Sequence, residues 1–482
     1  MVADWNFDIR PKMQVMSNEE VEYLYNRALD IIENTGVRFL HPEALKLLQE
    51  SGAVVSDNSI IKIQASLVEH AIRSVPKRLV IYDREGNPAM ELGGGNTGGR
   101  NTYYGTGSDL LHMYDPFTGE LRLTLARDIG DMAKVVDALP DMDFVMSYGI
   151  PSDSELEKVF QTEFVQMVEN TSKPIVFTSD NGHVSQQIID IAALVAGGSS
   201  ALKEKPFILN YSQPTSPLQH SHDALGKMFA CAQAEIPVVY PPGMIPGATA
   251  PCTMAGTIIQ SLAEGLTALT VHQLKRKGAP IVLCGAHGCM DMKSSINVYA
   301  APERLMTEAA LCAVYQYFKI PTWGFGGCTD AITLDEQAGM EFGMMSLWAS
   351  LCGVNLAHDV GYLGSGMIGD LRAIVLNNEI NGYVRHLVRN GVGVDKEKLA
   401  IEAIERVGAG GSFLMDKHTM DHFRTALWYP SLTNRDNLNK WQDMGEKPMK
   451  AVLGERVKEI LNKHEPKPLK KEIKDELEKV LI

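Results

Sequence analysis

The sequence predicts an α/β protein of the closed (β/α)8 type, the TIM barrel. Short apolar runs rich in β-forming residues alternate with longer amphipathic stretches along most of the 482 residues. Eight such runs are present, as many as this barrel has strands. Four runs begin at Pro174, Pro237, Pro280 and Pro321, and a strand tolerates proline at its first residue. A doubly wound open sheet is the competing architecture, but eight evenly spaced units favour closure.

The predicted strands share a buried, β-rich composition and are each followed by a helical pattern. Their ranges are 101–107, 143–150, 174–179, 207–212, 237–243, 280–288, 321–327 and 355–362. Between them, stretches such as ELEKVFQTEFVQMVENT and GTIIQSLAEGLTALTVHQLKRKG repeat apolar residues at three- and four-residue spacing. The stretch LRAIVLNNEINGYVRHLVRNG is the expected closing helix.

Three regions are expected along the chain. Residues 1–100 form an N-terminal α+β cap, residues 101–393 the barrel, and residues 394–482 a C-terminal helical extension packed on the barrel. Within this extension, MDKHTMDHFRTALWYP is expected to fold back onto the barrel.

Composition excludes several classes of function. The net charge is -14, and Lys and Arg are not clustered as a nucleic-acid surface requires. No apolar run approaches the ~18 residues of a membrane span, and the start lacks the pattern of a secretory signal. Seven scattered cysteines suit a reducing compartment better than a disulfide framework. We therefore expect a cytoplasmic protein that binds neither nucleic acid nor membrane.

Aromatic and polar residues gather at the predicted carboxyl ends of the strands, where barrels of this type build their active sites. The candidates for substrate binding are Tyr104, Tyr148, Asn210, Tyr211, Tyr240, His287, Trp323, Phe325, His358 and Tyr362. Tyr and Trp are also common strand residues, so any one of them can be simple core packing. Together, a ring of aromatic faces is how proteins hold a quaternary ammonium, through cation–π attraction of roughly 0.5 to 2 kcal/mol per face.

Four segments carry a resemblance to a known family. They are YDPFTGELRLTLARDIGDMAKVVDALPDMDFV, NYSQPTSPLQHSHDAL, GGCTDAITLDEQAGMEF and NLAHDVGYLGSG. The chain resembles the trimethylamine methyltransferase family from its N-terminal helices to about residue 430. That resemblance implies a TIM barrel that passes a methyl group from an amine to the cobalt of a separate corrinoid protein.

One departure narrows the expected substrate. Trimethylamine methyltransferases proper carry a pyrrolysine, whereas this chain contains only standard residues. It therefore resembles the branch that uses quaternary amines, with glycine betaine preferred over carnitine and proline betaine. The implied reaction releases dimethylglycine to solution and gives the methyl group to Co(I). No DxHxxG cobalamin-binding segment is present, so the corrinoid is expected on a partner protein and no tightly bound cofactor or metal is expected. A homo-oligomer is also expected.

Two residues are the candidates for catalysis. His358, followed by Asp359, ends an apolar strand where it is expected to reach the ligand, with His287, Asn210 and Ser179 as further partners for a substrate carboxylate. The alternative is that His358 only ties two loops together. Asp330 is expected to face the substrate cation.

Two other functions compete with this hypothesis. Cys284, His287 and Cys289 could bind zinc in a thiol methyltransferase or hydrolase, although their spacing is not a compact metal motif and buried cysteine packing is favoured. A betaine-binding protein without chemistry is the third possibility, and it would bind a betaine without forming a demethylated product.

Overall fold

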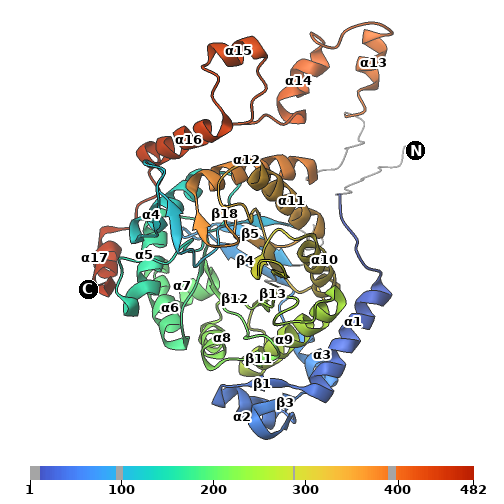
Figure 1. Ribbon diagram of the computed structural model, residues 1–482, viewed down its shortest axis with the longest axis vertical. Helices are drawn as coiled ribbons and strands as arrows, with labels where there is room; N and C mark the ends of the chain where they lie inside the picture. The colour runs from blue at the N-terminus through green and yellow to red at the C-terminus, as the bar shows by residue number, and fades with distance from the viewer. Residues whose placement is uncertain (1–10, 94–100, 286–287, 389–397, 482) are drawn as a thin grey trace.

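The computed structural model describes residues 11–93, 101–285, 288–388 and 398–481, and its centre is a parallel barrel (Figure 1). Seven strands are hydrogen-bonded in the order β6-β17-β16-β13-β12-β10-β9. Parallel bridges from Gly105 to Phe144 and from Val145 to Ile175 insert residues 144–145 between β6 and β9. The ring is therefore closed with eight members, and the predicted fold class is confirmed.

Each barrel strand falls inside one of the eight predicted runs. The strands are β6 (Tyr103–Tyr104), β9 (Ile175–Phe177), β10 (Ile208–Tyr211), β12 (Val238–Val239), β13 (Ile281–Cys284), β16 (Thr322–Phe325) and β17 (Leu356–His358), with residues 144–145 as the eighth member. Nearly all of these residues are buried because helices cover the outside of the barrel and side chains fill its inside.

The helices that follow the strands form the outer layer seen in Figure 1. They are α4 (Ala126–Ala138), α5 (Val159–Asn170), α6 (Gly182–Ala196) with the short α7 (Ser199–Glu204), α8 (His222–Ala234), α9 (Met254–Lys275), α10 (Pro302–Tyr317), α11 (Glu336–Cys352) and α12 (Leu371–Val388). Local chemistry sets several ends. Helix α11 begins where Asp335 accepts from Ala338 N, and it stops at Gly353, whose φ of 75° lies in the left-handed region.

The amino end of the barrel is plugged by a hairpin. Strands β4 (Arg78–Tyr82) and β5 (Pro88–Gly93) pair antiparallel, and Leu79, Ile81, Met90 and Leu92 point into the barrel. They pack with one inward residue from most strands, among them Trp323. The barrel is thus a packed core that can open only at its carboxyl end.

The N-terminal region packs beside α9 and α10. It contains α1 (Asn18–Asp30), the π-helical η1 (Ile31–Thr35), α2 (Pro42–Glu50), the 3-10 turn η2 (Asp57–Ser59) and α3 (Ala65–Ser74). Strands β1 (Val37–Phe39), β2 (Val54–Val55) and β3 (Ile60–Lys62) form a small sheet with β11 (Gln219–His220).

Loops with their own short strands surround the carboxyl end, which we call the mouth. Strands β7 (His112–Tyr114), β8 (Leu121–Leu123), β18 (Tyr362–Leu363) and β19 (Ile368–Gly369) form one sheet, β14 (Cys289–Asp291) and β15 (Ile296–Val298) form a hairpin, and the 3-10 turn η3 (Leu156–Lys158) precedes α5.

The C-terminal region differs in part from the expectation. Helices α16 (Met449–Lys463) and α17 (Lys471–Leu481) pack against α4 and α12 and against α5 and α6. In contrast, α13 (Ile401–Val407), α14 (Lys417–Ala426) and α15 (Leu438–Asp443) stand away from the barrel (Figure 1). The segment that contains α14 was expected to fold back onto the barrel, yet no residue of α14 is buried. Within the described ranges, no helix is both long enough and apolar enough to cross a membrane.

Candidate active site

Four predicted residues come together at the top of the barrel interior. The ring of His358 lies between Trp323 and Phe325, with centroids 4.4 and 4.6 Å away. Tyr211 joins them, 5.6 Å from Trp323 and 6.2 Å from His358. We call Tyr211, Trp323, Phe325 and His358 the aromatic group. Its rings come from β10, β16 and β17 and are tilted against one another.

His358 is held as a neutral imidazole. Its Nδ1 donates to the carbonyl oxygen of Gly324 at 2.7 Å, which fixes the proton on that nitrogen. Burial lowers the pKa of His358 to about 3. Its Nε2 lies 3.4 Å from Oδ1 of Asp359 and is free to accept a hydrogen bond. At neutral pH the aromatic group therefore carries no positive charge of its own.

Asp359 is a buried carboxyl group beside this imidazole. Burial raises its pKa well above the usual range, and the nearby Asp109 acts in the same direction. Its backbone is left-handed, with φ of 61°, and turns the carboxyl toward β6. A side chain on Gly107 would collide with the Asp359 carboxyl and with the ring of Tyr362. Glycine at 107 is thus required for this approach.

Two further carboxyl groups lie close by, on Asp109 and Glu163. The side chain of Asp109 is exposed to solvent, yet the surrounding protein still raises its pKa through desolvation. Asp109 is thus surrounded by protein atoms yet reached by water, and we use the name recess for the region formed by Asp109, Glu163, Asp359 and the aromatic group. Glu163 of α5 is 1% exposed, accepts from the hydroxyl of Thr178 at 3.1 Å, and has a raised pKa, chiefly through burial and then through Asp109. Among the described residues, its Oε1 has no hydrogen-bond partner.

Two cations lie near the recess among the residues that the structure describes, Arg304 and Lys227. Arg304 lies over the ring of Phe325 at 3.7 Å, donates to Glu308 at 3.1 Å, and is 1% exposed. Lys227 of α8 donates to the carbonyl oxygen of Ser179 at 3.0 Å, and burial lowers its pKa. Because Arg304 also pairs with Glu308, the described cations do not fully balance the three carboxyl groups of the recess.

The predicted catalytic residue Asp330 lies in a loop at the mouth. Its carboxylate accepts from the backbone N–H groups of Tyr299 and Ala300 and from the hydroxyl of Ser365. These bonds hold Tyr299 with its ring 5.4 Å from Phe325. Asp330 therefore reaches the aromatic group only indirectly, by holding Tyr299 in place against Phe325.

Three predicted binding residues lie on the outer side of the barrel. The hydroxyl of Tyr104 is 2.8 Å from the carbonyl oxygen of Ser346 on α11, and that of Tyr240 is 2.9 Å from Nδ1 of His220. The amide of Asn210 donates to the carbonyl oxygen of Phe177. Their strand neighbours occupy the interior, and successive strand residues point to opposite faces.

The remaining predicted residues have mixed positions. The hydroxyl of Tyr362 donates to the carbonyl oxygen of Ser108. The pKa of Tyr362 is raised mainly by burial and further by the nearby charge of Asp359. Tyr148 is buried, with its ring 5.7 Å from that of Tyr362. Its hydroxyl donates to the carbonyl oxygen of Gly361 and accepts from the backbone N–H of Asp370. The Ser179 hydroxyl is 2.6 Å from that of Ser185. His287 lies outside the described residues.

The proposed zinc ligands are not gathered in the described part of the chain. Cys284 packs against α10, with its Sγ 3.6 Å from Sγ of Cys312, while Cys289 begins the β14 hairpin. No group of three His, Cys, Asp or Glu side chains there has the spacing of a metal site. His287 is not among these described residues.

Sequence reasoning missed Asp109, Glu163 and Arg304. Glu163 lies within an amphipathic helical stretch, where a charged residue is normally assigned to the solvated face. Arg304 follows the proline that begins α10, and the helix start brings it over Phe325. Only the tertiary arrangement reveals that these groups meet.

The fold has counterparts among solved methyltransferases. The crystal structure of monomethylamine methyltransferase MtmB from Methanosarcina barkeri is similar to this chain with a TM-score of 0.53 and 12% identity, covering 97% of this chain and 89% of that one. At this identity the likeness concerns the fold alone.

The sequence comparisons define the family. A model of trimethylamine methyltransferase (MTTB) matches residues 5–482, and the chain belongs to this family of methyltransferases. The trimethylamine methyltransferase MttB of Desulfitobacterium hafniense is 32% identical, over 95% of this chain and 91% of the relative. A glycine betaine methyltransferase from another strain of that species is 26% identical, over 97% and 96%.

The burial of Glu163 predicts a pH-dependent effect of Glu163→Gln. Because the folded-state pKa is raised, the wild type loses stability as pH rises from the unfolded pKa through the folded pKa. Glutamine does not ionise, so the variant does not lose stability in this way. Its free energy of unfolding should therefore rise relative to that of the wild type as pH rises, by about 1.4 kcal/mol per unit of difference between the folded and unfolded pKa of Glu163. Urea unfolding at pH 5 and pH 8 measures this. The exposed Glu157→Gln is the matched control. An equal stability difference for Glu163→Gln at both pH values would contradict the account.

Proposed function

We propose that the protein transfers a methyl group from a quaternary amine, with glycine betaine as the best candidate, to Co(I) of a separate corrinoid protein. The other product is the tertiary amine, dimethylglycine. The observation that carries this proposal is one recess that combines the aromatic group with three incompletely balanced carboxyl groups. The similarity to a glycine betaine methyltransferase supports the same choice.

The aromatic group suits a trimethylammonium head. Such a head has no N–H to donate, so ring faces and diffuse negative charge bind it better than hydrogen bonds do. Tyr211 is the partly exposed member of the group, and its neighbours include Asp359 and Asp109. A cation placed there faces the ring of Tyr211 and compensates for the two carboxyl groups.

A betaine also has a carboxylate, which must be paired where it is buried. Arg304 is a buried guanidinium 3.7 Å from the centre of the Phe325 ring, and that ring also contacts His358. A planar guanidinium matches carboxylate geometry. We assign it as the group that faces the substrate carboxylate, in preference to Asn210, whose amide N–H donates to Phe177, and Ser179, whose hydroxyl bonds to Ser185.

The reaction needs placement more than proton transfer. The acceptor supplies a strongly nucleophilic Co(I), the methyl carbon–nitrogen bond breaks, and its electron pair stays on nitrogen. A quaternary amine leaves as a neutral tertiary amine without a proton, which suits a site whose His358 is neutral. The chain's own residues orient the head group and exclude water. The absence of pyrrolysine from the sequence favours a quaternary over a tertiary amine substrate.

The rim of the mouth suits a protein that brings the acceptor. Exposed apolar side chains, many of them methionines, surround it on loops and helix starts that follow β12, β13, β16 and β17. They are Met254, Met292, Ile296, Ile332, Met340 and Met367. Exposed apolar patches of this kind mark protein-binding surfaces, and flexible methionines adapt to a partner. We assign this rim to the corrinoid protein.

Methyl transfer to free cob(I)alamin tests the reaction. A panel of glycine betaine, carnitine, proline betaine and trimethylamine is incubated with the enzyme, and absorbance reports methylcobalamin. We expect one betaine to react, with the matching demethylated amine formed in equal amount, and trimethylamine to remain unreacted. Reaction of trimethylamine alone, or betaine binding without product when the corrinoid protein is also supplied, would contradict the proposal.

The cation–π assignment predicts a selective effect of Tyr211→Leu. Removal of the ring face should weaken glycine betaine binding by about 1 to 2 kcal/mol, while Tyr211→Phe, which keeps the face, should bind nearly as well as the wild type. Calorimetric titration measures both. The isostere 3,3-dimethylbutyrate keeps the carboxylate, but carbon replaces nitrogen and its tert-butyl group has no charge; it should bind equally to all three proteins. If Tyr211→Leu weakened the isostere as much as the betaine, the ring would be acting through shape alone.

A further inference from the structure

Residues 398–447 form an arm that extends away from the barrel (Figure 1). The arm contains α13, α14 and α15, which have 7, 10 and 6 residues. Helices α14 and α15 bury no residue, and α13 buries only Ala403. Isolated helices shorter than about 12 to 15 residues are marginal in water, because tertiary packing supplies most of their stability. These helices therefore require a surface that this copy of the chain does not provide.

The arm carries many exposed apolar side chains. They are Leu399, Ile401, Ile404, Phe413, Leu414, Met415, Met420, Leu427, Tyr429, Leu438 and Met444. Leu414 and Met415 are 75% and 82% exposed. Single exposed apolar residues are ordinary, but a concentration on one projecting segment marks an interface.

The base of the arm identifies where it leaves the barrel. The carboxylate of Glu379 on α12 accepts from the backbone N–H groups of Ser431, Leu432 and Thr433. One turn later on α12, the ring of Tyr383 lies 5.2 Å from that of Trp428. Helix α12 starts after the carboxyl end of β17 and runs back toward the amino end of the barrel. The base is thus away from the mouth, where the methyl acceptor has to dock.

The surface area of the chain also indicates a missing partner. A compact monomer of 53.0 kDa should expose roughly 17,700 Å². This chain exposes 22365 Å². The chain therefore exposes several thousand Å² more than a compact monomer of its mass, which leaves enough surface for an interface between two chains.

The charge of the arm suits a second copy. The whole chain has a net charge of -14, whereas the arm contains seven basic and seven acidic residues. A neutral, apolar segment can lie on a strongly acidic copy of the same chain without like-charge repulsion.

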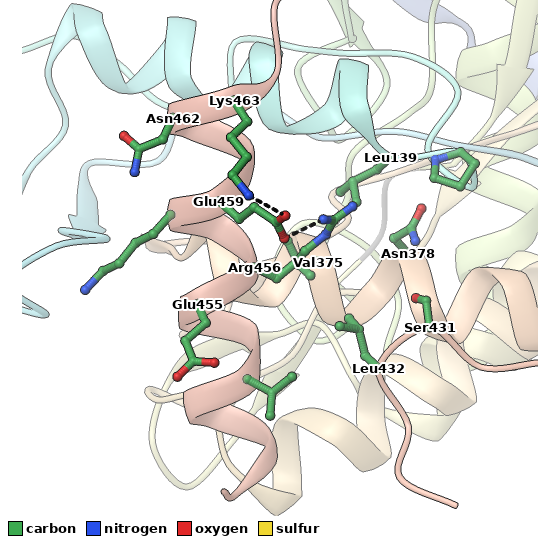
Figure 2. Close-up of a pocket in the computed structure, with 13 residues that line it drawn as sticks. Leu139, Val375, Asn378, Ser431, Leu432, Glu455, Arg456, Glu459, Asn462 and Lys463 are labelled. Carbon is green, nitrogen blue, oxygen red and sulfur yellow. Dashed lines mark hydrogen bonds and ion pairs between the residues drawn. The ribbon is translucent and has the colours of Figure 1, made fainter. Parts of the chain in front are cut away.

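A groove beside the base of the arm offers a receiving surface (Figure 2). Its volume is about 870 Å³, and it lies between α12, α16 and the end of α4. Leu139, Val375, Leu432 and Val452 supply apolar lining. Ion pairs from Glu459 to Arg456 and Lys463 cross one wall. A two-fold axis near this groove would place each arm on the groove of the other copy, because such an interface uses the same patch twice.

We propose that the protein is a homo-oligomer in which two copies exchange the outer parts of their arms, so that the exposed apolar side chains between Leu399 and Met420 of each copy pack against the groove between α12 and α16 of the other. The arm then gains the packing that its short helices lack.

Sedimentation velocity at micromolar concentration tests this proposal. The wild type should have a mass of at least two chains. Leu414→Asp on the arm and Val452→Asp in the groove should each weaken association by roughly 100-fold, because each places a charge in an apolar contact. The control is Leu156→Asp, since Leu156 is 91% exposed but lies outside both surfaces; it should keep the wild-type mass.

Near-ultraviolet circular dichroism of each variant checks that the barrel remains folded. A monomeric wild type, or the wild-type mass in either the arm or the groove variant, would overturn the proposal. The sedimentation result does not depend on the proposed methyl transfer, because none of these variants changes a residue of the recess.

Discussion

The burial of carboxyl groups at the carboxyl end of the barrel is the constraint on which the site depends. Desolvation raises the pKa values of Asp359 and Glu163, and Asp109 lies beside both. A carboxylate in such a place is costly unless a cation accompanies it. Within the part of the chain that the structure describes, Arg304 also pairs with Glu308, so its charge is shared between that carboxylate and those of the recess. A cationic ligand would complete the balance.

The proposed chemistry uses the same imbalance. While the substrate is intact, its positive charge favours ionised carboxyl groups around it. As the carbon–nitrogen bond breaks, that charge disappears, and strong fixed ion pairs would hold the substrate back because they favour the ground state over the transition state. Carboxyl groups with raised pKa values can take up a proton as the charge is lost. Ring faces bind the cation without a formal charge, and the neutral His358 adds no repulsion.

The sequence was sufficient for the barrel but only partly for the site. Apolar runs and strand-initial prolines located all eight barrel members, because burial on both faces leaves a clear pattern. The pattern did not reveal which face each residue takes. Tyr104 and Tyr240 were therefore grouped with Tyr211, although a one-residue shift reverses the direction of a strand side chain. Glu163 enters the recess from a helix, a contact that local sequence cannot specify.

The most direct test of the central claim is the number of protons exchanged when glycine betaine binds. Calorimetric titrations at pH 7 in buffers of different ionisation enthalpy measure this number. If a quaternary cation completes the charge balance of Asp359, Asp109 and Glu163, binding lowers their raised pKa values and releases protons. The account predicts a net release of protons when the wild type binds glycine betaine, and a smaller release when the Asp359→Asn variant binds it. Binding with no proton exchange, or with proton uptake, would contradict it.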